Sequence, residues 1–222
     1  MSQQKKTRTK STERLSTRFR QIRMEVAAEA ARIIATEGQR NYHAAKKKAA
    51  ERVGVSERLA LPSNLEVKEA LSCYQALYGG SRHHNNLERL RTVAIQAMLL
   101  LAEFKPRLVG PVLDGTADEH SRVALHVFCD SPDFLVLYFL EKGTTFQQEQ
   151  RQIRWHDGKH RTLPIILFEL DETTIELGVF DLVNLRQAPP SPIDGKPQRR
   201  ANLPEIESLL GSADQDRFSM GT

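Results

Sequence analysis

The first half of the chain has apolar residues at the spacing of amphipathic helices. Between Arg18 and Glu37 they recur every three or four positions, at Ile22, Val26, Ala30, Ile33 and Ile34. The same spacing predicts three further helices, over residues 41–52, 64–78 and 82–104, with Asn64 capping the second of these. Glycine or proline follows each of the four helices, as is typical of helix ends: Gly38, Gly54, Gly79 and Pro106.

After Pro106 the pattern changes to short apolar runs of strand length. These runs cover residues 107–114, 122–128, 146–156, 159–170 and 174–182. The last three predict an antiparallel meander, with Asp157-Gly158 as a hairpin turn. Ser131-Pro132-Asp133 predicts a helix that runs to Gly143, because serine caps a first turn and proline suits its first position. Helices followed by strands indicate an α+β chain.

Charge and proline content divide the chain further. Residues 1–23 hold eight lysines and arginines and one glutamate, a net charge of +7, whereas the whole chain carries +4 and the rest therefore −3. We expect a basic flexible arm over 1–23, a helical region over 24–105 and an α+β domain over 106–185. Residues 186–222 then form a proline-rich strap, a short helix over 203–210 and a tail.

Composition limits the class of protein. Of the 222 residues, 40% are hydrophobic and 27% charged, which is ordinary for a globular protein. No apolar run approaches the roughly 20 residues that span a bilayer, and no apolar leader is visible. The two cysteines, Cys73 and Cys129, form no disulfide framework. We therefore expect a cytoplasmic protein with no membrane partner.

Residues Met24–Ser56 resemble the first two helices of a TetR-type DNA-binding domain. In that family a recognition helix begins near the position of Ser56 and enters the major groove. Here Pro62 follows closely, and its missing N–H and its effect on Leu61 leave no room for a helix long enough to contact bases. Nucleic-acid binding through the basic N-terminal region remains an alternative function.

Residues 107–182 resemble the nucleotidyltransferase superfamily. Its domains have a strand ending in Gly-Ser, a strand with two carboxylates at alternate positions and a third carboxylate on a later strand. Here Leu108–Asp114 supplies the first strand and Gly115-Thr116 the turn, Ser121–Val127 matches the carboxylate strand, and Glu176 matches the third carboxylate. The resemblance implies a mixed sheet with flanking helices, a turn whose N–H groups contact phosphates, and Mg²⁺ held by carboxylates that share a strand face. Tyr74–Tyr78 and Arg186–Pro192 also resemble uncharacterised bacterial proteins of this superfamily.

This chain departs from the family pattern at the metal. The two expected carboxylates are Arg122 and Ala124, a local charge change of +3 that opposes a divalent cation. Glu176 remains, and Asp114 stands close by in the sequence, so these two are the candidate catalytic residues, with Mg²⁺ as cofactor if activity persists. The resemblance otherwise implies a pseudoenzyme that binds nucleotide or nucleic-acid phosphates.

Basic residues near the proline-rich strap extend this hypothesis. The candidate phosphate-binding residues are Gly115, Thr116, Arg122, Lys196 and Arg199. His126 shares a strand face with Arg122 and Ala124 and could line the same cleft. A third hypothesis is a scaffold whose α+β domain makes only protein contacts. The nucleotidyltransferase-like hypothesis differs from the other two in one geometric expectation, namely that Arg122, Ala124 and Glu176 converge in one groove.

Overall fold

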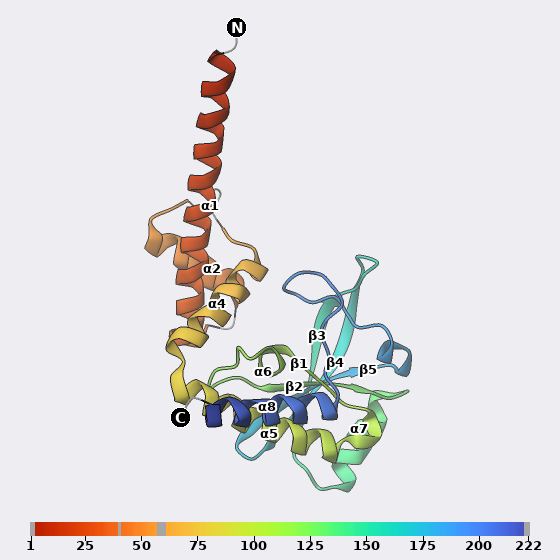
Figure 1. The fold of residues 1–222 in the computed structure, drawn as a ribbon. Coiled ribbons are helices and arrows are strands. Elements are labelled where there is room, and N and C mark those ends of the chain that lie inside the picture. The colour runs from red at the N-terminus through yellow and green to blue at the C-terminus, as the bar shows by residue number, and fades with distance from the viewer. Residues whose placement is uncertain (1–2, 40, 57–60, 220–222) are drawn as a thin grey trace. The chain divides into compact units, whose positions relative to one another are not determined.

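The computed structural model describes residues 3–39, 41–56 and 61–219 (Figure 1). They form two compact units, 1–80 and 81–222, each described separately below. The sequence analysis expected the α+β domain to begin at 106. The structure instead groups α5 (Gly80–Leu100) with the sheet, because the apolar stripe of this helix packs into the sheet's hydrophobic core. In the described residues, no helix is both long enough and apolar enough to cross a membrane.

The first unit contains α1 (Gln3–Glu37), α2 (Tyr42–Val53) and α4 (Asn64–Tyr78). Small side chains let these helices pack closely, and the buried core consists of Val26, Ala27, Ala30, Ile33, Ala45, Ala49, Ala50 and Val67. Residues 3–23, where the sequence predicted a flexible arm, form the first part of α1. The position at which a TetR-type recognition helix would start leads into residues 57–60, which lie outside the described residues.

Local signals explain where these helices begin and end. The Asn41 side chain accepts hydrogen bonds from the backbone N–H groups of His43 and Ala44, and Gly54 ends α2 with a left-handed φ of 75°. The expected cap at Asn64 is wrong. Ser63 caps α4 instead, because Glu66 three residues later returns a hydrogen bond to its N–H and completes a capping box.

The second unit is a five-stranded mixed sheet with helices, as the α+β prediction requires. The strands are β1 (Arg107–Val109), β2 (Val123–Phe128), β3 (Phe146–Arg154), β4 (His160–Leu170) and β5 (Thr173–Phe180), in the order β1-β2-β5-β4-β3. The helices are α5, α6 (Gly110–Asp114), α7 (Pro132–Glu141) and α8 (Leu203–Ser219), with short 3₁₀ turns at Ala102–Phe104 and Leu182–Leu185. β2 and β5 are parallel neighbours, and the predicted meander of β3, β4 and β5 is antiparallel.

The predicted strand over 107–114 is wrong beyond its first three residues. β1 ends at Val109, and Gly110 adopts a left-handed φ of 73°. Pro111 then follows in the first turn of α6, where its fixed φ suits the helix and its missing N–H costs nothing. An apolar run that could be read as one strand is therefore a short strand, a sharp turn and a helix of one turn.

The two faces of the sheet have different coverings. α5, α7 and α8 contribute to one core with the alternate side chains Val123, Leu125 and Val127 of β2 and Ile175, Leu177 and Val179 of β5. We call this the covered face. The other face carries Ala124, His126, Glu176 and Gly178, and we call it the open face.

Candidate anion-binding site

The site begins at the parallel pair in the middle of the open face. Ala124 of β2 and Glu176 of β5 are register partners, as are His126 and Gly178 two residues further on. Side chains at these alternate positions of neighbouring strands project from the same face of the sheet. The structure therefore brings together Ala124 and Glu176, which lie 52 positions apart in the sequence.

Two arginines neutralise the Glu176 carboxylate. Arg151 of β3 donates from Nη1 to Oε1 at 2.6 Å and from Nη2 to Oε2 at 2.9 Å, and Arg122 donates from Nη1 to Oε2 at 3.3 Å. Burial would raise the pKa of Glu176, whose side chain is 14% exposed, but the hydrogen bonds and charge of Arg151 and Arg122 hold it below its usual value. Glu176 is thus a carboxylate that is ionised at neutral pH and held in a bidentate clamp by Arg151.

This donor set does not fit Mg²⁺. The ion requires an octahedron of oxygen ligands. The site offers one carboxylate whose two oxygens already accept hydrogen bonds from arginines, with the methyl group of Ala124 beside it. Among the described residues no group of three His, Cys, Asp or Glu side chains is placed to hold a metal ion. Two arginines against one carboxylate leave this cluster with a net positive charge.

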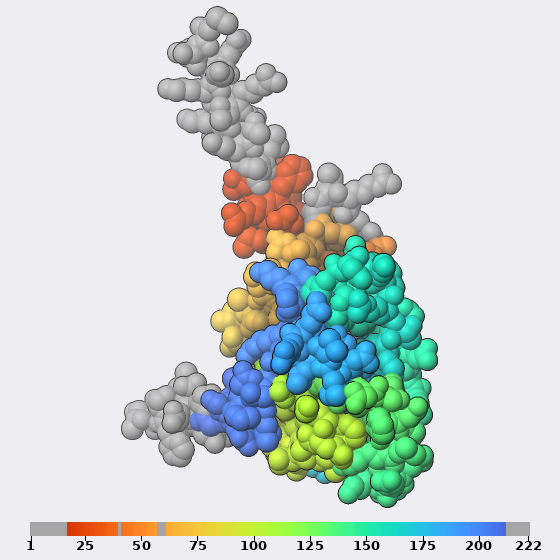
Figure 2. All heavy atoms as spheres, turned by 90° about the vertical axis from the view of Figure 1, so that its right-hand side faces the viewer, coloured from red at the N-terminus to blue at the C-terminus, as the bar shows by residue number. Residues whose placement is uncertain are grey.

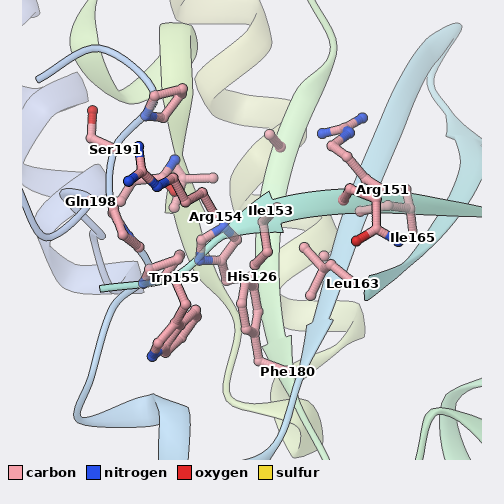
Figure 3. Close-up of a pocket in the computed structure, with 18 of the residues that line it drawn as sticks. His126, Arg151, Ile153, Arg154, Trp155, Leu163, Ile165, Phe180, Ser191 and Gln198 are labelled. Carbon is pink, nitrogen blue, oxygen red and sulfur yellow. The ribbon is translucent and has the colours of Figure 1, made fainter. Parts of the chain in front are cut away.

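A pocket of about 750 Å³ opens on this face (Figure 3). Figure 3 shows Arg151 and Ile165 on one side of the pocket, His126 and Phe180 near its middle, and Trp155, Ser191 and Gln198 on the other side. Glu176, Ala124 and Gly178 also line it, together with Gly110 at the start of α6. The pocket therefore joins the arginine–carboxylate cluster to an aromatic and proline-lined end.

Glycine at position 178 shapes the wall near the middle of the pocket. A Cβ added there would lie 3.3 Å from a Leu163 methyl carbon and from the Phe180 ring, and 3.4 Å from the His126 ring. These distances are tighter than ordinary van der Waals contact. The absence of a side chain at Gly178 lets the imidazole of His126 and the Phe180 ring approach each other, with their centroids 4.5 Å apart.

His126 is a buried structural histidine that the sequence analysis proposed as a cleft residue. Its Nδ1 accepts a hydrogen bond of 3.0 Å from Nε of Arg200, and its side chain lines the pocket. Burial, followed by the charge of Arg200, lowers the pKa of His126 to about 3. Arg200 itself donates to the Asn184 carbonyl oxygen at 2.7 Å, and its guanidinium lies 5.0 Å from the Phe128 ring centroid. Burial and the nearby Arg107 lower the pKa of Arg200 to about 10, so it stays charged at neutral pH.

The strap, residues 186–200, forms the far wall of the pocket. Backbone hydrogen bonds from Ser191 to Lys196 and from Gln198 to Pro189 fold it into a tight hairpin. Pro189, Pro190, Pro192 and Gln198 line the pocket, whereas Lys196 lies in the exposed turn and Arg199 is exposed on the strap's last turn. The strap thus returns over the sheet as the sequence suggested, but Lys196 and Arg199 are not among the lining residues.

Asp114, Gly115 and Thr116 lie at the C-terminal end of α6, away from the pocket lining. Gly115 ends α6 with a φ of 79°, and a Cβ there would lie 3.9 Å from an Arg91 nitrogen. Thr116 is buried and donates its N–H to the Pro111 carbonyl oxygen. The glycine that follows β1 and reaches the pocket is Gly110. The Gly110-Pro111 pair was the signal in the sequence, because proline after glycine is typical of a turn entering a helix.

The acidic residues between α6 and β2 have local partners. Asp118 accepts a hydrogen bond of 2.7 Å from the Ser121 hydroxyl and closes the loop, and Glu119 pairs with Arg82 at 2.7 Å. Both carboxylates therefore have hydrogen-bond or ion-pair partners other than the residues that surround Glu176. The functional residues that sequence reasoning missed are Arg151 and Trp155, which belong to the β3 strand and the turn that follows it.

Neither the protein-family models nor the curated proteins compared with this chain give a match. The function must therefore be argued from the geometry of the pocket.

Proposed function

We propose that the second unit is a nucleotidyltransferase-like domain that has lost metal-dependent catalysis and binds the phosphate groups of a nucleotide in the open-face pocket. The observation that carries this proposal is the register pair of Ala124 and Glu176, with Arg122 and Arg151 on the carboxylate. The superfamily that the sequence resembles needs carboxylates at the positions of Arg122 and Ala124. Their replacement by a cation and a methyl group favours a bound anion over a bound metal.

The charges and shape of the pocket support a phosphate ligand with an attached ring. Arg151 and Arg154 line the pocket beside the single Glu176 carboxylate, and Arg122 adds a third positive charge to that cluster. Guanidinium groups match phosphate oxygens in a bidentate arrangement. At the other end, the strap prolines offer apolar surface suited to a base or another planar group, and the largely buried Trp155 forms part of the same wall.

Trp155 makes this proposal directly testable, because it is the chain's one tryptophan and it lines the pocket. The experiment titrates ATP, AMP and inorganic phosphate into the full chain with EDTA, following Trp155 fluorescence and binding heat. We expect saturable binding of the nucleotides without Mg²⁺, and at least about tenfold weaker binding in Arg151→Gln. Arg82→Gln removes the same charge from an exposed pair outside the pocket and should bind as the native chain does.

Two outcomes contradict the proposal. If millimolar nucleotide gives neither a fluorescence change nor binding heat, the pocket does not bind the phosphate groups of a nucleotide. If nucleotide binds only in the presence of Mg²⁺, the proposal that binding is independent of a metal ion is wrong.

The lost metal site is tested by rebuilding it. Arg122→Asp combined with Ala124→Asp places two carboxylates on the strand beside Glu176 and removes one of its arginine partners. We expect this double variant to gain binding of Mn²⁺, detected by the loss of its free-ion electron paramagnetic resonance signal. Arg122→Asn with Ala124→Asn is the isosteric control and should gain none. A double variant that folds but does not bind Mn²⁺ contradicts the superfamily relationship. That result does not bear on the proposal that the pocket binds an anion.

A further inference from the structure

The free edge of the sheet at β3 is a surface that the pocket does not explain. β3 is the last strand in the order β1-β2-β5-β4-β3, and on one side it pairs with β4 through nine uninterrupted register pairs. Among the described strands none pairs with its other side. Seven of its nine residues, 147–152 and 154, are exposed. Figure 1 shows the β3–β4 hairpin projecting from the sheet, and Figure 2 shows its surface beside the strap.

This edge lacks most of the features that prevent strands from pairing between molecules. Natural sheets protect their edges with prolines, bulges, short strands or charges that repel an incoming copy. β3 is long, contains no proline and has no bulge in its register with β4. Its charges, Glu149, Arg151 and Arg154, are of mixed sign. The edge is therefore open to another strand.

The sequence of β3 is complementary to itself about Gln150. In an antiparallel pair centred on this residue, Gln150 faces Gln150 of the second copy and Gln148 faces Gln152. Glu149 then faces Arg151 twice, once on each side of the two-fold axis. Opposite charges directly across two strands stabilise the pair, whereas a shift by one residue in either strand would lose both ion pairs.

The partner of Gln150 on β4 also favours this register. Gln150 faces Pro164, which has no N–H to donate to the ladder. A proline within a strand is accommodated where that donor is not needed, so we expect the N–H and C=O of Gln150 to point to the free edge. Gln148 and Gln152, two residues away on either side, then share this orientation.

We propose that two copies of this chain associate through antiparallel pairing of their β3 edges, centred on Gln150, into one continuous ten-stranded sheet. The pairing places Glu149 of the second copy on the same sheet face as Arg151, so each copy adds a carboxylate beside the other's pocket. A single strand edge buries less surface than a stable dimer interface, so the dimer is a weak one that forms reversibly. This proposal does not depend on the ligand of the pocket.

Register-specific crosslinking tests the proposal. In the Cys73→Ser background, Gln150→Cys places the thiol on the two-fold axis, where facing Cα atoms lie within disulfide range. Gln148→Cys is the matched control, because its own copy in the second chain lies roughly 13 Å away along the strand. We expect mild oxidation to crosslink the first variant and not the second. A mixture of Gln148→Cys and Gln152→Cys chains should crosslink to each other.

Sedimentation equilibrium of the full chain measures the association itself. Gln150→Pro removes the N–H at the centre of the free edge and should weaken dimerisation at least about tenfold, whereas Gln150→Thr keeps it and should not. Glu149→Arg should dissociate the dimer by placing like charges opposite each other, and Glu149→Arg with Arg151→Glu should restore it. A native chain that stays monomeric, a dimer insensitive to Gln150→Pro, or equal crosslinking of the 148 and 150 thiols each overturn the proposal.

Discussion

The covered and open faces of the β2–β5 pair are built from the same two strands but hold different chemistry. On the covered face, Leu125 and Leu177 are fully buried against the helices. On the open face, their immediate neighbours Ala124 and Glu176 line a pocket, and Glu176 pairs with Arg151 and Arg122. Because strand side chains alternate, one peptide segment supplies the core with every second residue and lines the pocket with the rest.

The comparison teaches that the residues of the open face are placed by a core to which they do not belong. The positions of Arg122, Ala124 and Glu176 are set by the β2–β5 register, and that register is held by the apolar residues of the covered face. We expect substitutions on the open face to leave the packing of this core unchanged. Variants on the two faces should therefore separate into those that change stability and those that change recognition.

The largest expected effect comes from the covered face. Leu125→Ala removes a fully buried side chain from the main core and leaves a cavity, which should lower the free energy of unfolding by about 3 kcal/mol. Urea denaturation followed by Trp155 fluorescence measures it. Nucleotide affinity of the folded protein should not change. A loss below about 1 kcal/mol would show that this face does not carry the core.

The fold could be predicted further than the site. Helical spacing and the capping signal at Ser131 placed helices because those features depend on neighbouring residues only. The run after Pro106 was misassigned because apolar periodicity does not distinguish a short strand from a buried helical turn. Gly110 and Pro111 determine that the strand ends and a helix begins, because Gly110 adopts a positive φ and the fixed φ of Pro111 suits a first helical turn.

The site could be predicted only where it lies on β2 and β5. The resemblance to the nucleotidyltransferase superfamily led to the expectation that Arg122, Ala124 and Glu176 converge, and the structure places them together. Arg151 could not be found in this way, because it lies on β3 and reaches Glu176 of β5 across β4, which depends on the order of the strands in the sheet. Lys196 and Arg199 are exposed and do not line the pocket, whereas the strap prolines do.

A pH titration of stability distinguishes the open face from the covered face. His126 has a pKa of about 3 in the folded chain, below the ordinary 6.5, because it is buried beside Arg200. The unfolded chain takes up this proton below about pH 6.5 while the folded chain does not. The free energy of unfolding should therefore fall as pH decreases from 6.5 toward 3, by up to about 1.4 kcal/mol per pH unit from this group.

His126→Gln should flatten this dependence, since the amide can accept the Arg200 hydrogen bond without titrating. Leu125→Ala is the comparison variant, because it should lower stability at every pH and keep the native slope. Urea denaturation at half-unit steps between pH 4 and 7 gives both curves. Equal slopes in the native chain and His126→Gln would contradict a buried neutral imidazole.

Glu176→Gln should have the smallest effect on the free energy of unfolding, and it should also change the affinity for nucleotide. The partly exposed Arg151 limits the ion pair to about 1 kcal/mol. The pKa of Glu176 is lowered in the folded chain, so its contribution is present above about pH 4.5 and is lost as pH falls through the lowered value. The stability difference between native chain and variant should therefore vanish at low pH.

At neutral pH the variant releases Arg151 from a competing carboxylate, so nucleotide binding should tighten. Weaker binding would mean that Glu176 positions Arg151 for the ligand.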